Sequence, residues 1–192
     1  MFNLVLFGPP GAGKGTQAEK LIEKYGFNHI STGEVIREQI RKGTELGRSV
    51  QSYIEKGQLA PDGLVIDIIA DYVAKHKDAK GNIFDGFPRT TVQAKAFDEI
   101  MEKNGTPVSV MLSLEVPDEE LVKRLLLRGK ESGRADDSNE GVIRDRIDVY
   151  KAQTAIVAEH YKRQGKYRAV NGVGAVDEVF GCLCAEIDPL IK

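Results

Sequence analysis

The stretch LVLFGPPGAGKGT, residues 4–16, decides how the rest of this chain is interpreted. A short apolar run, typical of a buried strand, ends abruptly in a segment with four glycines, two prolines and one lysine. Glycines let the backbone curl so that successive N–H groups point inward, and the start of a following helix adds a positive field. Such a loop can cradle a polyphosphate. We infer that side chains are missing here because the phosphates of a ligand take their place.

The loop fits the pattern GxxxxGK from Gly8 to Lys14, but Gly15 fills the usual Ser/Thr position and the hydroxyl comes one residue later, at Thr16. Lys14 would reach the outer phosphates, and Thr16 could help to hold a magnesium ion. A glycine-rich turn without a ligand is the alternative, and the number of matching positions disfavours it. The expected contacts of the loop with ATP are Gly11, Ala12, Gly13, Lys14, Gly15 and Thr16.

Composition sets the broad class of protein. With 192 residues, 41% hydrophobic and 29% charged, the chain is expected to form one soluble globular unit. It is long enough to bury a core without disulfides or a structural metal. A net charge of −2 argues against a general nucleic-acid binder. Cys182 and Cys184 are too close in sequence for a disulfide framework. The apolar run ends at Gly8, and no stretch is long enough for a bilayer, so we expect a cytoplasmic protein without membrane contact.

Short apolar runs alternate with segments of helical period, which is typical of an α/β fold with a mostly parallel sheet covered on both faces. Two segments do not fit this alternation: residues 32–60 contain two short helical patterns separated by Gly43, and residues 129–140 are polar and unpatterned. We expect both to leave the sheet. The predicted strands are residues 2–7, 28–31, 82–85, 108–114 and 167–170, and the predicted helices are residues 15–25, 61–75, 90–103, 117–128, 142–162 and 175–191.

Two further motifs, HISTGEVIR at residues 29–37 and DGFPRTTVQ at residues 85–93, follow the loop in order. Together the three motifs resemble those of adenylate kinases from the first strand to the last helix. The resemblance implies a three-layer P-loop kinase fold: one domain with a five-stranded parallel core (1–31, 61–128 and 141–192), a mobile cap for the nucleoside monophosphate (32–60) and a short lid (129–140). No Asn-Lys-x-Asp signature of a GTPase occurs.

The second motif predicts the acceptor side of the site. Asp85 closes an apolar run, where a carboxylate can hold magnesium directly or through water. By resemblance, Arg89 holds the acceptor phosphate and Gln93 reads adenine, since a carboxamide offers both a donor and an acceptor. UMP/CMP kinases typically have Asn where this chain has Thr90. The AMP contacts implied by the resemblance are Thr32, Gly33, Arg37, Ile54, Gln58, Leu59, Ala60, Gly86, Arg89, Gln93, Arg134 and Arg146, with only the backbone of Gln58 carried over because some relatives have lysine there.

Several arginines lie in and around residues 129–140, the second of the two segments that leave the sheet; we call residues 32–60 and 129–140 the first and second excursions. Arg124 and Arg128 are four residues apart, so they share a helix face and are both expected on the ATP side. Arg134 lies in SGRADD, a close match to an adenylate kinase lid. The second arginine on the lid side is either Arg144 or Arg146, because the spacing from Arg134 to Arg146 is one residue longer than is usual in the family. The apolar stripe of the following helix borders Arg146 and not Arg144, which favours Arg146.

The expected reaction is reversible transfer of the terminal phosphoryl group of ATP to AMP, giving two ADP, with Mg²⁺ and no structural zinc. Such transfer needs alignment and charge neutralisation more than covalent chemistry. Two alternatives remain: a UMP/CMP kinase, and a regulatory protein that binds a nucleotide without transfer. We expect a monomer that has no nucleic-acid or membrane partner. The residues expected around the transferring group are Lys14, Arg89, Arg124, Arg134 and Arg146.

Overall fold

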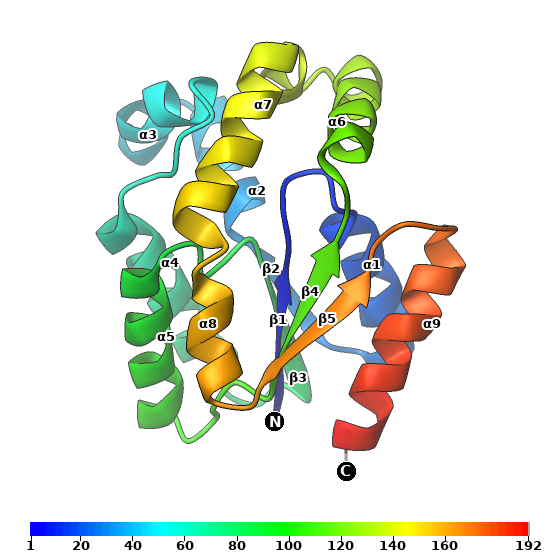
Figure 1. The fold of residues 1–192 in the computed structure, drawn as a ribbon. Coiled ribbons are helices and arrows are strands. Elements are labelled where there is room, and N and C mark those ends of the chain that lie inside the picture. Colours follow the sequence, from blue (N-terminus) through cyan, green and yellow to red (C-terminus); the bar gives the residue numbers. More distant parts are fainter. Residues whose placement is uncertain (192) are drawn as a thin grey trace.

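The computed structural model describes residues 1–191, and their strands form one parallel sheet in the order β2-β3-β1-β4-β5 (Figure 1). The predicted strands are confirmed, with ends that differ by at most two residues. Because all neighbours are parallel, every carboxyl end lies at the same edge of the sheet. The strands are β1 Phe2–Phe7, β2 Asn28–Ser31, β3 Gly81–Asp85, β4 Val110–Glu115 and β5 Tyr167–Asn171.

Helices cover both faces of the sheet, as predicted for an α/β fold (Figure 1). One layer contains α1 (Lys14–Tyr25) and α9 (Val176–Ile187), and the other contains α4 (Asp62–Lys75), α5 (Thr91–Lys103) and α8 (Val157–Arg163). Alternate residues of β1 serve the two layers. Leu4 and Leu6 belong to the apolar cluster beneath α1 and α9, whereas Val5 belongs to the cluster beneath α4, α5 and α8. The strand is therefore buried on both sides, which explains its unbroken apolar run.

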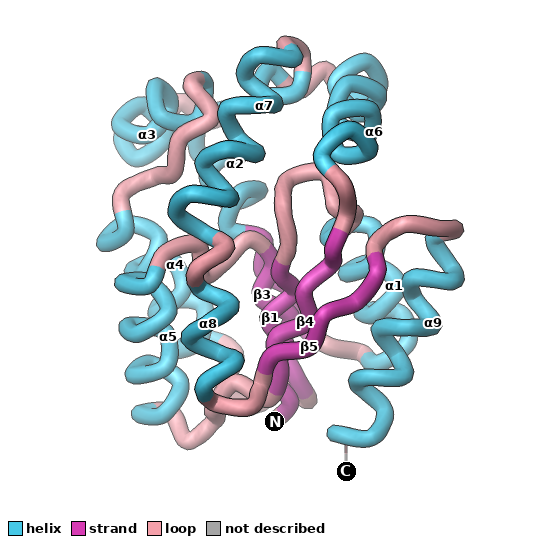
Figure 2. The backbone as a smooth tube through the Cα atoms, in the orientation of Figure 1, coloured by secondary structure: helices cyan, strands magenta, loops and turns pink. Residues whose placement is uncertain are grey.

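The first excursion consists of α2 (Thr32–Arg41) and α3 (Glu45–Glu55), as the two short helical patterns predicted. Each helix begins at a hydroxyl cap: Ser31 accepts a hydrogen bond from the Glu34 N–H, and Thr44 accepts one from the Gly47 N–H. Both helices stand beyond the carboxyl edge of the sheet (Figure 2). They are placed to cover whatever binds there.

The second excursion is more regular than its composition predicted. Helix α6 (Asp118–Ser132) runs four residues past its expected end, α7 (Glu140–Val149) begins two residues before its expected start, and a short 3₁₀ turn covers residues 135–137. Gly129 explains the close return of the chain onto α6, because a Cβ there would lie only 2.3 Å from the Asp137 carbonyl oxygen. The irregular part of the lid is thus confined to residues 133–139.

The single helix predicted over residues 142–162 is wrong, because the segment divides into α7, a π-helical turn at residues 150–154 and α8. Ile143 and Ile147 pack in the apolar cluster of one sheet face, whereas Val157 and Tyr161 pack in that of the other. One straight stripe cannot serve two faces, and a π turn changes the direction of the stripe. Among residues 1–191, no helix combines the length and apolarity that crossing a membrane requires.

Candidate active site

The loop between β1 and α1 carries backbone donors without side-chain competitors. Gly11 has a φ of 83°, and a Cβ there would lie 2.8 Å from the side chain of Leu125, so glycine is needed on both counts. Gly13 precedes α1 in the left-handed conformation, and no side chain caps the helix. The first N–H groups of α1 are therefore free to bind an anion.

Lys14 is the cation of this loop. Its Nζ donates hydrogen bonds of 2.9 Å to the Gly8 and Pro9 carbonyl oxygens. Burial lowers the pKa of Lys14 from 10.5 to about 8, and the nearby charges of Arg89, Arg128 and Arg146 act in the same direction. An ammonium group held beside other cations favours an anionic ligand.

Asp85 ends β3 and faces this cation. Burial opposes ionisation of the Asp85 carboxyl, but His29 and Lys14 outweigh it and keep its pKa below the ordinary value. The contact between His29 Nε2 and Asp85 Oδ2 is 3.7 Å, which is longer than a hydrogen bond. An ionised carboxylate beside a phosphate-binding loop fits a magnesium ion that takes its remaining ligands from phosphate and water. The predicted partner, Thr16, lies exposed in the first turn of α1.

The acceptor side is a continuous set of hydrogen bonds. The Gly86 carbonyl oxygen accepts from Arg89 Nε at 2.6 Å and from Thr32 Oγ1 at 3.0 Å. The backbone N–H of Arg89 donates to Gln93 Oε1 at 2.7 Å, and Gln93 Nε2 donates to Asp62 at 2.8 Å. The predicted phosphate-binding and base-reading residues are therefore joined in one network. Burial lowers the pKa of the Arg89 guanidinium.

Arg37 stands on α2 beside a groove of about 570 Å³ that Arg134 and Glu34 also line. Burial lowers the pKa of Arg37 to about 10, and the positive charge of Arg134 adds to the effect. The guanidinium folds back toward Gly33, since a Cβ on Gly33 would lie 3.0 Å from Arg37 Nη1. The cap and the lid thus bring cations to the same groove.

The rest of the predicted AMP-binding stretch leads from the cap back to the core. Ala60 is buried and Ile54 packs against the same apolar cluster, while Leu59 is half-buried. Gln58 has an exposed side chain, and its backbone N–H is engaged by the Tyr53 carbonyl. The side chain of Gln58 is therefore turned away from the core, and its backbone contact with AMP stays a prediction.

Two lid carboxylates hold the arginines together. Asp137 is fully buried and pairs with Arg128 at 2.6 Å, with Arg146 at 2.5 Å and with Arg134 at 3.3 Å. Asp136 pairs with Arg134 at 2.9 Å and with Arg146 at 3.2 Å. Burial opposes ionisation of Asp136, but Arg134 and Arg146 hold its pKa at about 2. Sequence reasoning gave these carboxylates no role, although two acids at the second and third positions after Arg134 were a visible signal.

The two candidate partners of Arg134 lie in different surroundings. Arg144 is exposed and pairs with Glu119 and Glu140 on the surface. Arg146 has only 16% of its side chain exposed and lies close enough to Lys14 and Arg89 to affect the pKa of both. The geometry therefore supports the choice of Arg146.

Arg124 is the predicted catalytic residue that lies elsewhere in this structure. Its guanidinium donates to the Gly172 carbonyl at 3.1 and 3.2 Å, and its Nε pairs with Glu120 at 2.8 Å. Arg128, one turn further along α6, is the residue beside Lys14. The two arginines share a helix face, but the loop after β5 takes one of them. The spacing of the two arginines does not predict that this loop lies beside Arg124.

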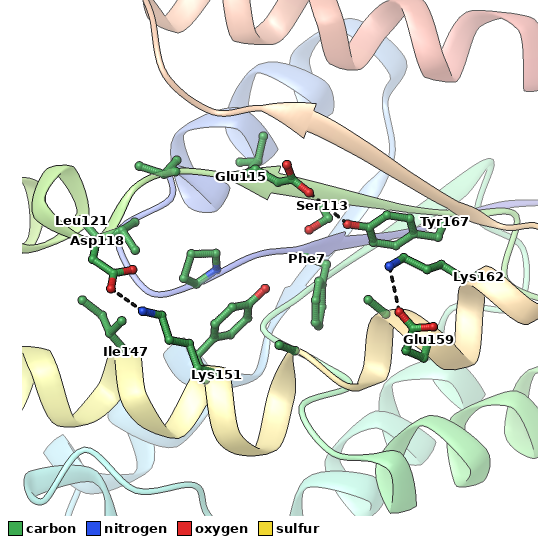
Figure 3. A pocket seen from close by; sticks show the side chains of 16 residues that line it. Phe7, Ser113, Glu115, Asp118, Leu121, Ile147, Lys151, Glu159, Lys162 and Tyr167 are labelled. Carbon is green, nitrogen blue, oxygen red and sulfur yellow. Dashed lines mark hydrogen bonds and ion pairs between the residues drawn. The ribbon is translucent and has the colours of Figure 1, made fainter.

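A separate cavity of about 280 Å³ lies between β4, β5 and the α7–α8 segment (Figure 3). Phe7 and Ser113 line its floor. Four of its charged side chains form two pairs, Lys162 with Glu159 at 2.8 Å and Lys151 with Asp118, and the fifth, Glu115, accepts a hydrogen bond from the Tyr167 hydroxyl at 3.3 Å. Each charged side chain of the cavity thus has a partner within the cavity wall, and we assign the cavity no part in the site. Among the described residues, no cluster of three or more His, Cys, Asp or Glu side chains is arranged to hold a metal ion.

The phosphate-binding loop lies at the carboxyl edge of a parallel sheet, between the hydrogen-bonded acceptor side that α2 and α3 cover and a lid rich in arginine. This arrangement defines a phosphotransferase that works on nucleotides. The family model described as adenylate kinase matches residues 6–166. The chain belongs to the adenylate kinase family, which confirms the resemblance of its motifs and its fold.

Similar proteins cover nearly the whole chain. An adenylate kinase of Bacteroides fragilis is 53% identical over 190 residues, which are 99% of this chain and 100% of that protein. One of Parabacteroides distasonis is 54% identical over 181 residues, 94% of this chain and 95% of that protein. One of Flavobacterium johnsoniae is 46% identical over 190 residues, 99% of this chain and 100% of that protein.

Proposed function

We propose that this chain catalyses reversible transfer of the terminal phosphoryl group of ATP to AMP, giving two ADP. The observation that carries the proposal is the convergence of Lys14, Arg89, Arg128 and Arg146 at one end of the sheet, where their charges affect each other. Such a set of cations is suited to two anionic substrates that meet end to end. Membership in the adenylate kinase family supports the same activity.

We divide the site between two substrates. The backbone of residues 11–16 and Lys14 would bind the ATP phosphates, with Arg128 beside them. Arg37, Arg89 and Thr32 would bind the AMP phosphate, and Gln93 would read its base. This division is supported by the hydrogen bonds that join Thr32, Gly86 and Arg89 on one side and Lys14 to the loop on the other.

Arg124 belongs, in this proposal, to the nucleoside end of the ATP site and not to the transferring phosphoryl group. Its guanidinium is planar and lies at the Gly172 carbonyl, where the flat face of a guanidinium can stack on a base. Arg128 takes over the phosphate role. In this arrangement Arg124 would place its positive charge at the base of ATP, and Arg128 would supply the charge at the phosphates.

The chain contributes alignment and charge neutralisation to the reaction. Arg89 and Arg146 would hold the acceptor phosphate in line with the donor, and Lys14 would neutralise charge on the outer phosphates. A Mg²⁺ ion, held by Asp85 and Thr16 directly or through water, would supply further charge neutralisation when bound. Asp136 and Asp137 hold the lid arginines in place before a substrate arrives.

Closure over the substrates would exclude water, which competes with AMP as an acceptor. Gly57, at the end of the cap, already touches the lid-side helix, because a Cβ there would lie 2.6 Å from Arg146 Cγ. Through this contact the cap meets α7, the helix that follows the lid. We further propose that one chain acts alone in the cytoplasm, since it supplies groups for both substrates.

An acceptor panel tests the proposed function. The purified chain would be incubated with ATP and magnesium and with AMP, CMP, UMP or no acceptor, and ADP formation would be followed in a coupled assay. We expect rapid turnover with AMP alone. Equal turnover without an acceptor would refute the proposal, turnover with CMP and UMP would indicate a pyrimidine kinase, and ATP binding without transfer would indicate a regulatory protein.

A further inference from the structure

The side-chain amide of Gln93 is held from both sides. Its Oε1 accepts from the backbone N–H of Arg89 at 2.7 Å, and its Nε2 donates to Asp62 Oδ1 at 2.8 Å. Gln93 is 1% exposed, so neither bond competes with bulk water. Both partners impose the same orientation of the amide. A backbone N–H can only donate, and an ionised carboxylate can only accept.

Thr90 completes the arrangement. Its hydroxyl accepts from the backbone N–H of Gln93 at 3.2 Å, where it caps α5, and donates to the same Asp62 oxygen at 2.9 Å. Because an ionised carboxylate can only accept, the one proton of the hydroxyl is directed to Asp62, while the hydroxyl oxygen accepts the cap bond. One carboxylate from α4 therefore fixes the side chains of two residues at the start of α5.

The fixed orientation of the Gln93 amide determines where it offers a donor and where it offers an acceptor to a base. A carboxamide oxygen has a second lone pair and its nitrogen a second N–H, so Gln93 keeps one acceptor and one donor. A 6-aminopurine presents a donor at its amino group and an acceptor at the neighbouring ring nitrogen. A 6-oxopurine presents the reverse pair and would match only a rotated amide. Rotation would oppose the amide N–H to the Arg89 N–H and its oxygen to Asp62.

We propose that Asp62, with Thr90, is a specificity-determining positioning residue that fixes the polarity of Gln93 for 6-aminopurines and against 6-oxopurines. The proposal rests on the proposed function, in which Gln93 contacts the acceptor base. It goes further by assigning the discrimination to a carboxylate that does not touch the base. The pairing of Thr90 with Asp62 also gives a reason for threonine at this position.

The test compares AMP with inosine monophosphate, which differs in the 6-substituent and the adjoining ring nitrogen. We would measure kcat and KM for both acceptors at saturating ATP, and KM for ATP, in the wild-type protein, Asp62→Ala and Asp62→Asn. The matched control is Asp67→Ala, an exposed acid on the same helix. Thr90→Val and the conservative Thr90→Ser examine the second bond. Melting curves and calorimetric binding of both nucleotides would accompany the kinetics.

We expect the wild-type protein to prefer AMP over inosine monophosphate by about 100-fold or more in kcat/KM, because a wrong base leaves buried polar groups unpaired. Asp62→Ala should raise KM for AMP by about tenfold, since a hydrogen bond to a charged group is lost. It should narrow the preference by a similar factor, with an unchanged KM for ATP. The preference for AMP should narrow less in Asp62→Asn and Thr90→Val. It should be unchanged in Thr90→Ser and Asp67→Ala.

Two failures are distinguishable. If the wild-type protein does not phosphorylate AMP, the proposed function fails. If it does so and the preference is unchanged in both Asp62 variants, the positioning role is wrong. Asp62→Asn keeps one oxygen that can accept both bonds, so the decisive second variant is Asp62→Leu, measured in the same way, which is similar in size and has no acceptor. An unchanged preference in Asp62→Leu overturns the proposal even if Asp62→Ala does not fold. Equal use of both acceptors by the wild-type protein would also overturn it.

Discussion

Replacing Lys14 with methionine should change the pH dependence of stability in a direction that the loop geometry determines. Burial and three arginines lower the pKa of Lys14 from 10.5 to about 8 in the folded protein. The unfolded chain keeps the ordinary value. Between these two pH values the unfolded state binds more protons than the folded state, so the wild-type protein gains stability as the pH rises. A methionine variant has no proton to lose at this position and lacks this gain.

The size of the effect follows from the same two values. The pKa falls from 10.5 to about 8, and each tenfold change in proton affinity is worth about 1.4 kcal/mol, so the wild-type protein should gain about 3 kcal/mol relative to Lys14→Met across this range. Loss of the hydrogen bonds from Lys14 Nζ to the Gly8 and Pro9 carbonyls changes the free energy of unfolding of the variant by a constant amount. The dependence of the difference on pH remains. Other groups that titrate cancel in the comparison.

Urea unfolding of both proteins from about pH 7 to about pH 11 measures this difference. Lys14→Arg is the control, because arginine keeps its charge throughout and should show no gain. The methionine variant should also lose about 100-fold or more in kcat, since it lacks a charge that stabilises the transferring phosphate. A stability difference that stays constant over this pH range would show that the ammonium group is not held at a depressed pKa.

Four substitutions examine the lid and α7, the helix that follows it. Gly129→Ala should displace the chain at Asp137 and lower kcat by about 100-fold, because a shift of about 1 Å in a positioned group costs that much; a wild-type rate would show that the close contact is relaxed at no cost. Asp137→Asn should lower the free energy of unfolding by about 3 kcal/mol, because three arginines lose the buried carboxylate that pairs with them, and unchanged unfolding in urea would contradict the three pairings. Arg146→Ala should reduce kcat by about 100-fold or more, whereas Arg144→Ala should stay within about twofold; the reverse order in the coupled assay would exchange their assignments.

Local sequence determined the parts of this protein whose physical cause is local. The apolar run of residues 2–7 and the glycines after it specify a buried strand and a loop of free N–H groups, whatever else surrounds them. Ser31 and Thr44 mark the starts of α2 and α3 because a hydroxyl caps a helix over three residues. The ends of the strands and the positions of Lys14, Asp85 and Arg89 at one edge of the sheet follow from such signals.

Only the tertiary structure decided which distant side chains share a partner. Arg124 and Arg128 have the same helical phase, but the loop after β5 binds the first and Asp137 binds the second. Asp62 reaches Gln93 across 31 residues, and no spacing rule connects a residue at the start of α4 with one on α5.

The segment after the lid changes from one apolar cluster to the other, which broke the helix that its periodicity predicted. Periodicity reports only that a face is buried. Which neighbour buries it, and which charge it meets, depends on contacts between segments that the chain brings together when it folds.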